Sequence, residues 1–119
     1  MSTFQAVLKQ LANKQKKQGI RYGLPALEKV LSQLGNPQHS KIPTVHIAGT
    51  NGKGSTLTYI ASALQSCGFS VGTYTSRHLL SYTERFCINQ TPISESDFCF
   101  YYDLVKTYSD SLTEFEMLT

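Results

Sequence analysis

A run of seven residues from Gly49 to Ser55 (GTNGKGS) limits the possible folds of this chain more than any other segment. The segment before this run, 44–48, is short and partly β-branched, as is typical of a strand. Apolar residues at helical spacing follow the run, so we expect the run to join a strand to a helix. Unpaired backbone N–H groups and the positive end of a helix dipole meet at such a junction, and glycines let the backbone approach an anion. Lys53 adds a charge for outer phosphates, and a hydroxyl of Ser55 or Thr56 suits Mg²⁺. These features predict a phosphate-binding loop.

The spacing of this run departs from the common nucleotide-binding pattern G-x-x-x-x-G-K-[ST]. That pattern would need glycine at position 47, where an isoleucine stands, and serine or threonine directly after Lys53, where Gly54 stands. For the loop taken alone, a glycine-rich strand-to-helix turn with a surface lysine is therefore an alternative interpretation.

The segments after the loop predict an α/β fold. The helical stripe ends near Gly68, and a second strand is expected at 69–74. Strand, glycine loop, helix and strand form a βαβ unit, and such units build parallel sheets with right-handed crossovers. A further strand at 85–89 and a helix that begins near Ser94 continue the pattern. We therefore expect a parallel sheet of the P-loop NTPase type with flanking helices.

Two helices are expected before the loop. Apolar residues at positions 4, 7, 8 and 11 share one helix face, and Gly19 is the predicted end of that helix. A second helix is expected between Pro25 and Gly35. The four lysines from Lys9 to Lys17 are interpreted as a solvated helix face and linker, with contact to phosphate or RNA as the alternative.

Composition excludes several classes of protein. With 40% hydrophobic and 16% charged residues, the chain is not a highly charged disordered sequence, and its apolar runs are too short to span a bilayer. A net charge of +3 suits small anionic ligands but is too weak to indicate nucleic acid. Three cysteines without zinc-ligand spacing favour free thiols in a reducing compartment. Because no secretory signal is visible, we expect a cytoplasmic protein without nucleic-acid or membrane partners.

Residues Thr113–Glu116 (TEFE) match the T-x-x-E capping box that begins a helix. The sequence stops three residues later, at Thr119, and a helix without a body is not expected to bury its apolar face. We therefore interpret 1–119 as the N-terminal portion of a longer protein. Within it, 1–40 would form a helical lead-in and 41–119 the P-loop βαβ region.

The loop and its surroundings closely resemble the folylpolyglutamate synthases and dihydrofolate synthases. These belong to the ATP-dependent Mur ligase superfamily, and in them G-T-N-G-K-G-[ST] replaces the common P-loop pattern. The resemblance is carried by His46–Thr56 and by Tyr74–Leu79 (YTSRHL), which is similar to the family's T-S-P-H-L. It continues through Thr83–Phe86 and Asn89–Ile93. It extends over 22–37 and 112–119, and so covers most of the chain from residue 20 onward. It implies the N-terminal part of the central ATPase domain of a Mur ligase.

The resemblance implies roles for single residues. Lys53 would be the catalytic charge on the transferred phosphoryl group, and Ser76 would bind Mg²⁺ together with Ser55. Ser76 could instead be a turn residue after its strand, and Thr113–Glu116 could act as a helix cap alone. The implied ATP-binding residues are Gly49, Thr50, Asn51, Gly52, Lys53, Gly54, Ser55 and Thr56. The implied contacts to a pterin or folate are Thr113, Phe115, Glu116 and His78.

Two details of these motifs are left open by the sequence. Arg77 stands where the family usually has proline, which restores a backbone N–H and adds a bulky cation. Glu84 and Arg85 are either an ion pair on a loop or a pair that faces the substrate.

The resemblance implies an ATP-dependent amide-forming ligase. A carboxylate of folate or dihydropteroate would be phosphorylated to an acyl phosphate, and the amino group of L-glutamate would then attack, with release of ADP and phosphate. The family's further metal ligands and its glutamate-binding domain would lie beyond Thr119, so residues 1–119 alone are expected to be inactive. The full-length protein is expected to be a monomer. The alternatives are another Mur-type ligase that acts on a cell-wall precursor, and a nucleotide-binding module without catalysis.

Overall fold

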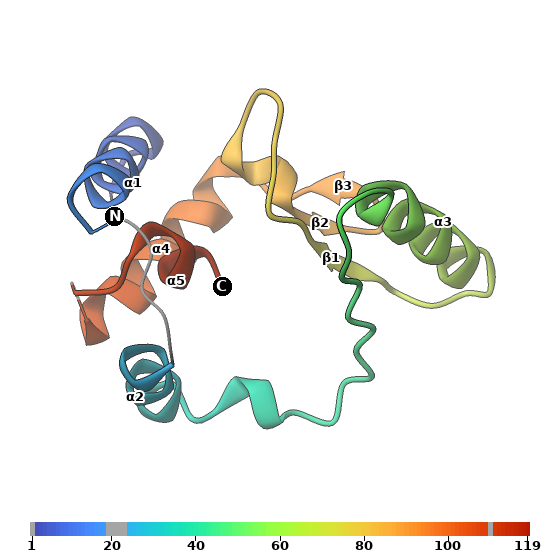
Figure 1. Cartoon of the computed structure of the whole chain (residues 1–119), viewed down its shortest axis with the longest axis horizontal. Helices are drawn as coiled ribbons and strands as arrows, with labels where there is room; N and C mark the ends of the chain where they lie inside the picture. The colour runs from blue at the N-terminus through green and yellow to red at the C-terminus, as the bar shows by residue number, and fades with distance from the viewer. Residues whose placement is uncertain (1, 19–23, 110) are drawn as a thin grey trace. The chain divides into compact units, whose positions relative to one another are not determined.

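The computed structural model describes residues 2–18, 24–109 and 111–119 (Figure 1). They divide into two compact units: unit 1 consists of Met1–Ile42 and Glu95–Thr119, and unit 2 consists of Pro43–Ser94. The predicted helix end at Gly19 lies outside the described residues, as does the start of the resembling segment at Tyr22. No helix within the described ranges is long and apolar enough to cross a membrane.

Unit 1 is helical, as the apolar spacing predicts. Val7 and Leu11 lie one turn apart on the same helix face, and both are fully buried. The first helix contacts the last two helices of the chain, and the second helix contacts the fourth. The elements of unit 1 are α1 (Phe4–Gln18), α2 (Pro25–Gln33), the 3₁₀ turn η1 (Pro37–His39), α4 (Glu95–Tyr108) and α5 (Glu114–Leu118).

The hydrophobic core of unit 1 lies where α1, α4 and α5 meet. The rings of Phe4 and Phe98 pack edge to face there, with centroids 5.7 Å apart. Each large apolar side chain that is fully buried stabilises the fold by about 1.5–3 kcal/mol. The buried apolar residues of unit 1 are Val7, Leu11, Val30, Phe98, Cys99, Tyr102, Leu112, Met117 and Leu118.

Lys14 is an exception to the solvated face predicted for the lysines of α1. Lys9, Lys16 and Lys17 are exposed, but Lys14 is buried and its Nζ donates a hydrogen bond of 2.9 Å to the carbonyl oxygen of Leu112. Lys14 follows Leu11 by three residues, so both lie on the face of α1 that packs inward.

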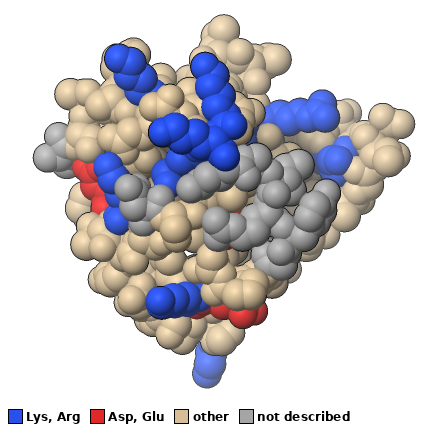
Figure 2. All heavy atoms as spheres, turned by 60° about the vertical axis from the view of Figure 1, so that its left-hand side comes forward, with Lys and Arg blue, Asp and Glu red and all other residues tan. Residues whose placement is uncertain are grey.

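Figure 2 shows Lys and Arg side chains spread over the face that it draws, with few Asp or Glu among them.

The expectation that the last helix has nothing to pack against is wrong. Met117 and Leu118 in α5 are buried, as is Leu112 just before it, and α5 contacts both α1 and α4. A single capped turn is enough to bury apolar side chains here, because α1 and α4 already pack together and offer a surface for α5. The chain therefore ends in part of the core of unit 1.

Unit 2 contains one long helix and a small sheet. The sheet has the order β1-β2-β3, and both neighbouring pairs are antiparallel. Asn89 and Gln90 turn the chain between β2 and β3 with φ angles of 50° and 67°, which suit a tight hairpin. The elements are α3 (Lys53–Ser66), β1 (Gly72–Tyr74), the 3₁₀ turn η2 (Tyr82–Arg85), β2 (Phe86–Ile88) and β3 (Thr91–Pro92).

The strand predicted at 44–48 is not formed, and the described strands make no parallel pair. The segment is mostly exposed, and Val45 presents 63% of its surface to solvent. A strand exists only through hydrogen bonds to a neighbour, and no described strand pairs with this one. The strands predicted at 69–74 and 85–89 are present in shortened form, as β1 and β2. The α/β character of the prediction holds.

Polar contacts connect the helix of unit 2 to its hairpin. Gln90 hydrogen-bonds Gln65 at 2.8 Å and Ser62 at 3.3 Å, both on α3. Asn89 and Val71 exchange two hydrogen bonds of 2.8 Å, one of them to the Asn89 side chain. Among the described residues of this unit, Ala61 is the only buried apolar residue, so unit 2 lacks a core of the kind found in unit 1.

Candidate phosphate-binding site

The predicted loop leads directly into α3, which begins at Lys53 (Figure 1). Gly49 has a φ of 150° and Gly52, at the N-cap position, a φ of 78°, so both need the freedom of glycine. No side chain caps this helix end. The first helical hydrogen bond runs from the N–H of Thr56 to the carbonyl of Gly52, at 2.9 Å. The N–H groups of the preceding residues therefore face outward at the positive end of the dipole.

Space around the loop is open. A Cβ atom built on Gly49, Gly52 or Gly54 would meet no atom within 4 Å. The glycine at position 54 is therefore not required by crowding inside the described chain, and its helical backbone would accept alanine. Open space above three glycines is what the close approach of a phosphate group requires.

The side chain of Lys53 folds back across the loop. Its Nζ donates a hydrogen bond to the carbonyl oxygen of Gly49, four residues earlier. The ammonium group thus lies over the backbone that would surround an anion, and the residue stays exposed. A phosphate oxygen could replace this carbonyl as the acceptor, because an ammonium is a point charge with three donors.

The hydroxyls predicted to bind Mg²⁺ are accessible. Ser55 and Thr56 lie in the first turn of α3, and Ser76 lies two residues after β1; all three are exposed. Within the described residues, no cluster of three or more His, Cys, Asp or Glu residues could hold a metal ion. A few hydroxyl oxygens still fit Mg²⁺, because this hard cation usually keeps several waters and takes phosphate oxygens as ligands.

The loop that carries Ser76 and His78 is fastened at both ends. The N–H of Thr75 donates to the carbonyl of Arg85 at 2.9 Å. At the other end, the carboxylate of Glu84 accepts hydrogen bonds from three successive backbone N–H groups, those of Leu79 (3.1 Å), Leu80 (2.9 Å) and Ser81 (2.6 Å). These bonds, led by the one from Leu79, hold the pKa of Glu84 below its ordinary range.

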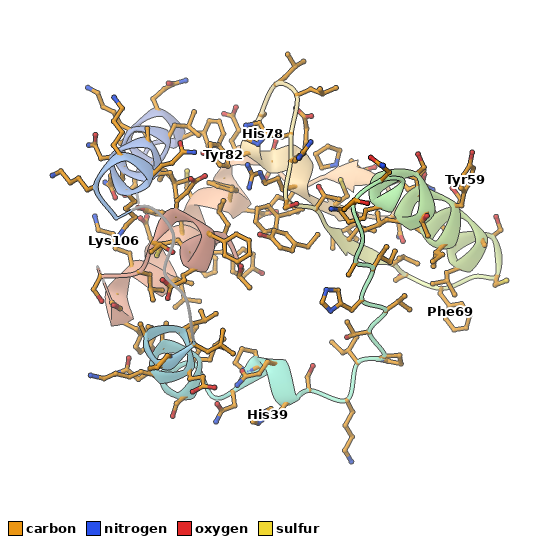
Figure 3. The ribbon with its side chains drawn as sticks, in the orientation of Figure 1. His39, Tyr59, Phe69, His78, Tyr82 and Lys106 are labelled. Carbon is orange, nitrogen blue, oxygen red and sulfur yellow. The ribbon has the colours of Figure 1, made fainter. Side chains whose placement is uncertain are left out.

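His78, Tyr82 and Arg85 form a compact cluster, and Figure 3 shows the first two side by side. The rings of His78 and Tyr82 have centroids 4.3 Å apart. The Nε of Arg85 donates to Nδ1 of His78 at 2.9 Å, and its guanidinium carbon lies 5.0 Å from the centroid of the Tyr82 ring. Glu84 and Arg85 therefore have different partners, and each is engaged with the loop at 75–81.

The predicted pterin contacts Thr113, Phe115 and Glu116 belong to unit 1, whereas the loop residues, Ser76 and His78 belong to unit 2. Thr113 and Glu116 form the predicted capping box: the N–H of Glu116 donates to the Thr113 hydroxyl at 3.2 Å, and that hydroxyl donates to Glu116 Oε1 at 2.9 Å. Both residues are buried. Phe115 between them is 62% exposed, so its ring is available for stacking.

The sequence also carries a signal for one further pair of residues at this site. Ser81 and Glu84 form a second capping box, with the Ser81 hydroxyl accepting from the N–H of Thr83 at 3.3 Å. The pattern S-x-x-E at 81–84 is visible in the sequence and predicts this turn. It would have assigned Glu84 to the backbone rather than to Arg85 or to a substrate.

Comparison with known proteins gives individual relatives, although no family model matches the sequence. A dihydrofolate synthase/folylpolyglutamate synthase of Bacillus subtilis is 38% identical over 109 residues, which cover 85% of this chain and 25% of that protein. A dihydrofolate synthetase of Saccharomyces cerevisiae is 42% identical over 104 residues, which cover 84% of this chain and 24% of that protein. The chain thus spans about a quarter of the length of the curated relatives it matches.

The fold has a solved counterpart. The crystal structure of a bifunctional folylpolyglutamate synthase/dihydrofolate synthase from Yersinia pestis, complexed with AMPPNP and a Mn ion, superposes with a TM-score of 0.86. The two sequences are 34% identical, and the match covers 98% of this chain and 28% of that one.

Proposed function

Because the chain belongs to the family of folylpolyglutamate and dihydrofolate synthases, we propose that it forms the nucleotide-binding part of an ATP-dependent ligase. The ligase joins the amino group of L-glutamate to a carboxylate of dihydropteroate or a folate. The observation that carries this proposal is the loop at 49–55, which leaves the start of α3 without a side-chain cap and folds Lys53 over the same backbone.

The reaction has two steps. The carboxylate of the pterin substrate attacks the γ-phosphorus of ATP, the bond to the bridging oxygen breaks, and ADP leaves. The amine of glutamate then attacks the acyl carbon, phosphate leaves with the C–O bonding electrons, and a proton is lost from nitrogen. Both steps move negative charge onto phosphate oxygens, so they need fixed positive charge and N–H donors at that place.

The residues of the loop supply those groups. The N–H groups at the start of α3 donate to the phosphates of ATP, and Lys53 neutralises charge on the outer ones. Ser55 and Ser76 would hold Mg²⁺, and the ion would supply positive charge that shields the phosphate oxygens. Gly49, Thr50, Asn51, Gly52, Gly54 and Thr56 shape the surface around the nucleotide. Gly49 and Gly52 do so through backbone conformations that other residues rarely adopt.

In unit 2, we assign to His78 a hydrogen bond to the pterin-type substrate. In unit 1, the exposed ring of Phe115 is suited to stack on a flat ring such as a pterin. The Thr113 hydroxyl and Glu116 Oε1 contact the pterin edge only if the capping box at the start of α5 opens, because these two atoms are bonded to each other. Phe115 is therefore better placed to contact a pterin than Thr113 or Glu116.

We also propose which part of a larger enzyme this chain forms. Residues 1–119 form the N-terminal portion of a Mur-ligase-type ATPase domain, in which 44–48 becomes a strand of a parallel sheet once neighbouring strands are present. The family's remaining metal ligands and its glutamate-binding domain would be supplied by further sequence. The complete enzyme is a cytoplasmic monomer.

An activity assay tests this function. The protein that carries this chain, expressed at full length with ATP, Mg²⁺, L-glutamate and either dihydropteroate or a folate, should release ADP in a glutamate-dependent manner. The two acceptors distinguish dihydrofolate synthesis from polyglutamate extension. Turnover with a cell-wall nucleotide precursor but with neither pterin would assign the protein to another Mur-type ligase. Nucleotide binding without turnover on any acceptor would leave only a binding module.

A further inference from the structure

The turn η2 presents Tyr82 and Arg85 to the same side. They are three residues apart in a 3₁₀ helix, where side chains at i and i+3 lie above one another. The loop before η2 brings His78 onto this pair, with its ring on Tyr82 and its Nδ1 at 2.9 Å from Nε of Arg85. The imidazole is therefore held by a tilted ring contact with Tyr82, which lies beside it in Figure 3, and by one hydrogen bond from Arg85.

This hydrogen bond determines which nitrogen of His78 carries the proton. An arginine guanidinium stays protonated at any physiological pH, so Nε of Arg85 is always a donor. Nδ1 of His78 must then offer its lone pair, and in the neutral imidazole the hydrogen resides on Nε2. Among the described residues, the bond from Arg85 is the only hydrogen bond of the His78 side chain. Nε2 is left as a donor for a molecule outside the described chain.

The backbone on either side of His78 is fixed as well. Thr75 is bonded to the carbonyl of Arg85, and the carboxylate of Glu84 holds the three N–H groups that follow His78. The imidazole thus lies on a loop that is tied to η2 at both ends, two residues after Ser76. A donor held in this way pays little conformational entropy when it meets its acceptor.

We propose that Arg85 is a positioning residue that holds His78 in the Nε2–H tautomer and directs this N–H to an oxygen of the pterin-type substrate. The acceptor is a carbonyl or carboxylate oxygen, since a neutral imidazole N–H seeks a lone pair. Arg85 acts through His78 and does not touch the substrate. The inference rests on the proposed function for the identity of the ligand, whereas the tautomer itself does not depend on that function.

Nitrogen NMR measures the tautomer directly. The full-length protein is prepared with ¹⁵N-labelled histidine rings, and the signals of His78 are assigned by their loss in His78→Gln. At a pH where the ring is neutral, Nδ1 should have a pyridine-type shift and Nε2 a pyrrole-type shift. In Arg85→Met both shifts should move towards the average of two exchanging tautomers. Arg77→Met, which removes an exposed arginine one residue from His78, should leave the His78 shifts unchanged.

Kinetics provides the second readout. Arg85→Met and His78→Gln should each raise the KM for the pterin substrate roughly tenfold, as expected for one lost hydrogen bond, with little change in kcat or in the KM for ATP. The double variant should be no worse than either single one, because both changes remove the same interaction.

Specific outcomes would overturn the inference. A pyrrole-type shift at Nδ1 of His78 in the unmodified protein does so without any variant, even if Arg85→Met fails to fold. Two kinetic results would also reject the inference. One is a rise in the KM for the pterin substrate in the double variant that equals the product of the two single effects. The other is an equal fall in kcat for every substrate. Absence of ligase turnover in the unmodified protein would instead reject the proposed function, while the tautomer measurement would still decide the role of Arg85.

Discussion

Lys53 and Gly52 contribute to the loop in different ways at the residue scale. Gly52 is needed for its backbone, because a φ of 78° strains any residue with a Cβ atom. Lys53 is needed for its charge, and its hydrogen bond to Gly49 already places that charge over the loop. A neutral side chain at position 53 would leave the shape of the loop intact and remove the group that stabilises phosphate charge.

Lys53→Ala in the full-length protein should therefore abolish ligase activity, with a loss of several kcal/mol of transition-state stabilisation. Steady-state turnover with ATP and Mg²⁺ measures the effect. Lys41→Ala, which removes an exposed lysine outside the loop, is the matched control and should be near neutral. A Lys53→Ala variant that keeps more than a tenth of the original kcat/KM would contradict the phosphate role.

Ser76→Ala tests the assignment of a metal ligand. The hydroxyl of Ser76 is exposed just after β1, so its removal should raise the Mg²⁺ concentration needed for half-maximal turnover far more than it weakens metal-free nucleotide binding. Ser70→Ala, at an exposed serine before β1, should behave as the unmodified protein. Identical Mg²⁺ titrations for the Ser76 and Ser70 variants would reduce Ser76 to a turn residue.

At the scale of elements, one carboxylate organises the turn η2 and the loop before it. Because three N–H groups stabilise the charged form, the pKa of Glu84 is lower in the folded loop than in the unfolded chain. The resulting stabilisation is complete above the ordinary glutamate pKa of about 4.3 and is lost as the pH falls through the lowered value.

Glu84→Gln should accordingly loosen this loop at every pH. Amide hydrogen exchange, corrected for the intrinsic pH dependence of exchange, should show reduced protection at Leu79, Leu80 and Ser81. In the unmodified protein the same loss should occur only under acid conditions, and the acid transition should be missing from the variant. Glu28→Gln on the exposed face of α2 serves as the control. Protection of the three amides that is unaffected by Glu84→Gln would exclude this role.

The capping box of α5 is a second element-scale device. Thr113→Ala removes the hydroxyl that accepts from the N–H of Glu116, and should destabilise unit 1 by about 1 kcal/mol. Thr113→Ser keeps the hydroxyl and should retain most of the stability, while Thr107→Ala, on the exposed surface of α4, should cost little. Chemical denaturation compares the three variants. Equal stability of the alanine and serine variants would show that the cap does not support the helix.

At the scale of the whole molecule, the two units differ in how they are held together. Among the described residues, every buried apolar side chain except that of Ala61 belongs to unit 1. In unit 2, the side chain of Gln90 in the hairpin hydrogen-bonds to Ser62 and Gln65 of α3. Burial of apolar surface is the main source of stability, so unit 2 should be the weaker part when residues 1–119 are made alone.

Hydrogen exchange on residues 1–119 should therefore show strong protection in α1 and α4, and weak protection in α3 and the sheet. Weak ATP binding should be measurable, because the loop and Lys53 are local to unit 2, but glutamate-dependent release of ADP should be absent. The reason is that the chain spans about a quarter of the length of its curated relatives. A single sharp melting transition together with glutamate-dependent turnover would refute this prediction.

The sequence predicts correctly those features that depend on residues close together in the chain. The helices α1 and α2 are predicted from the spacing of apolar residues within one or two turns. The same holds for the capping box at Thr113 and for the glycine loop before α3. Each of these features arises from backbone hydrogen bonds and side-chain spacing within a short segment, so a short segment is enough to recognise it.

The tertiary structure decided the features that depend on distant partners. Pairing of strands is one such feature: 44–48 has the composition of a strand, but the antiparallel sheet formed by the described residues does not include it. The burial of Lys14 against Leu112 and the packing of α5 on α1 each join residues far apart in the chain. The bond from Arg85 to His78 depends on how a loop folds back onto η2. Local spacing can place a residue such as Lys14 on the inward face of its helix, but the distant partner in each of these contacts is set only when the chain folds.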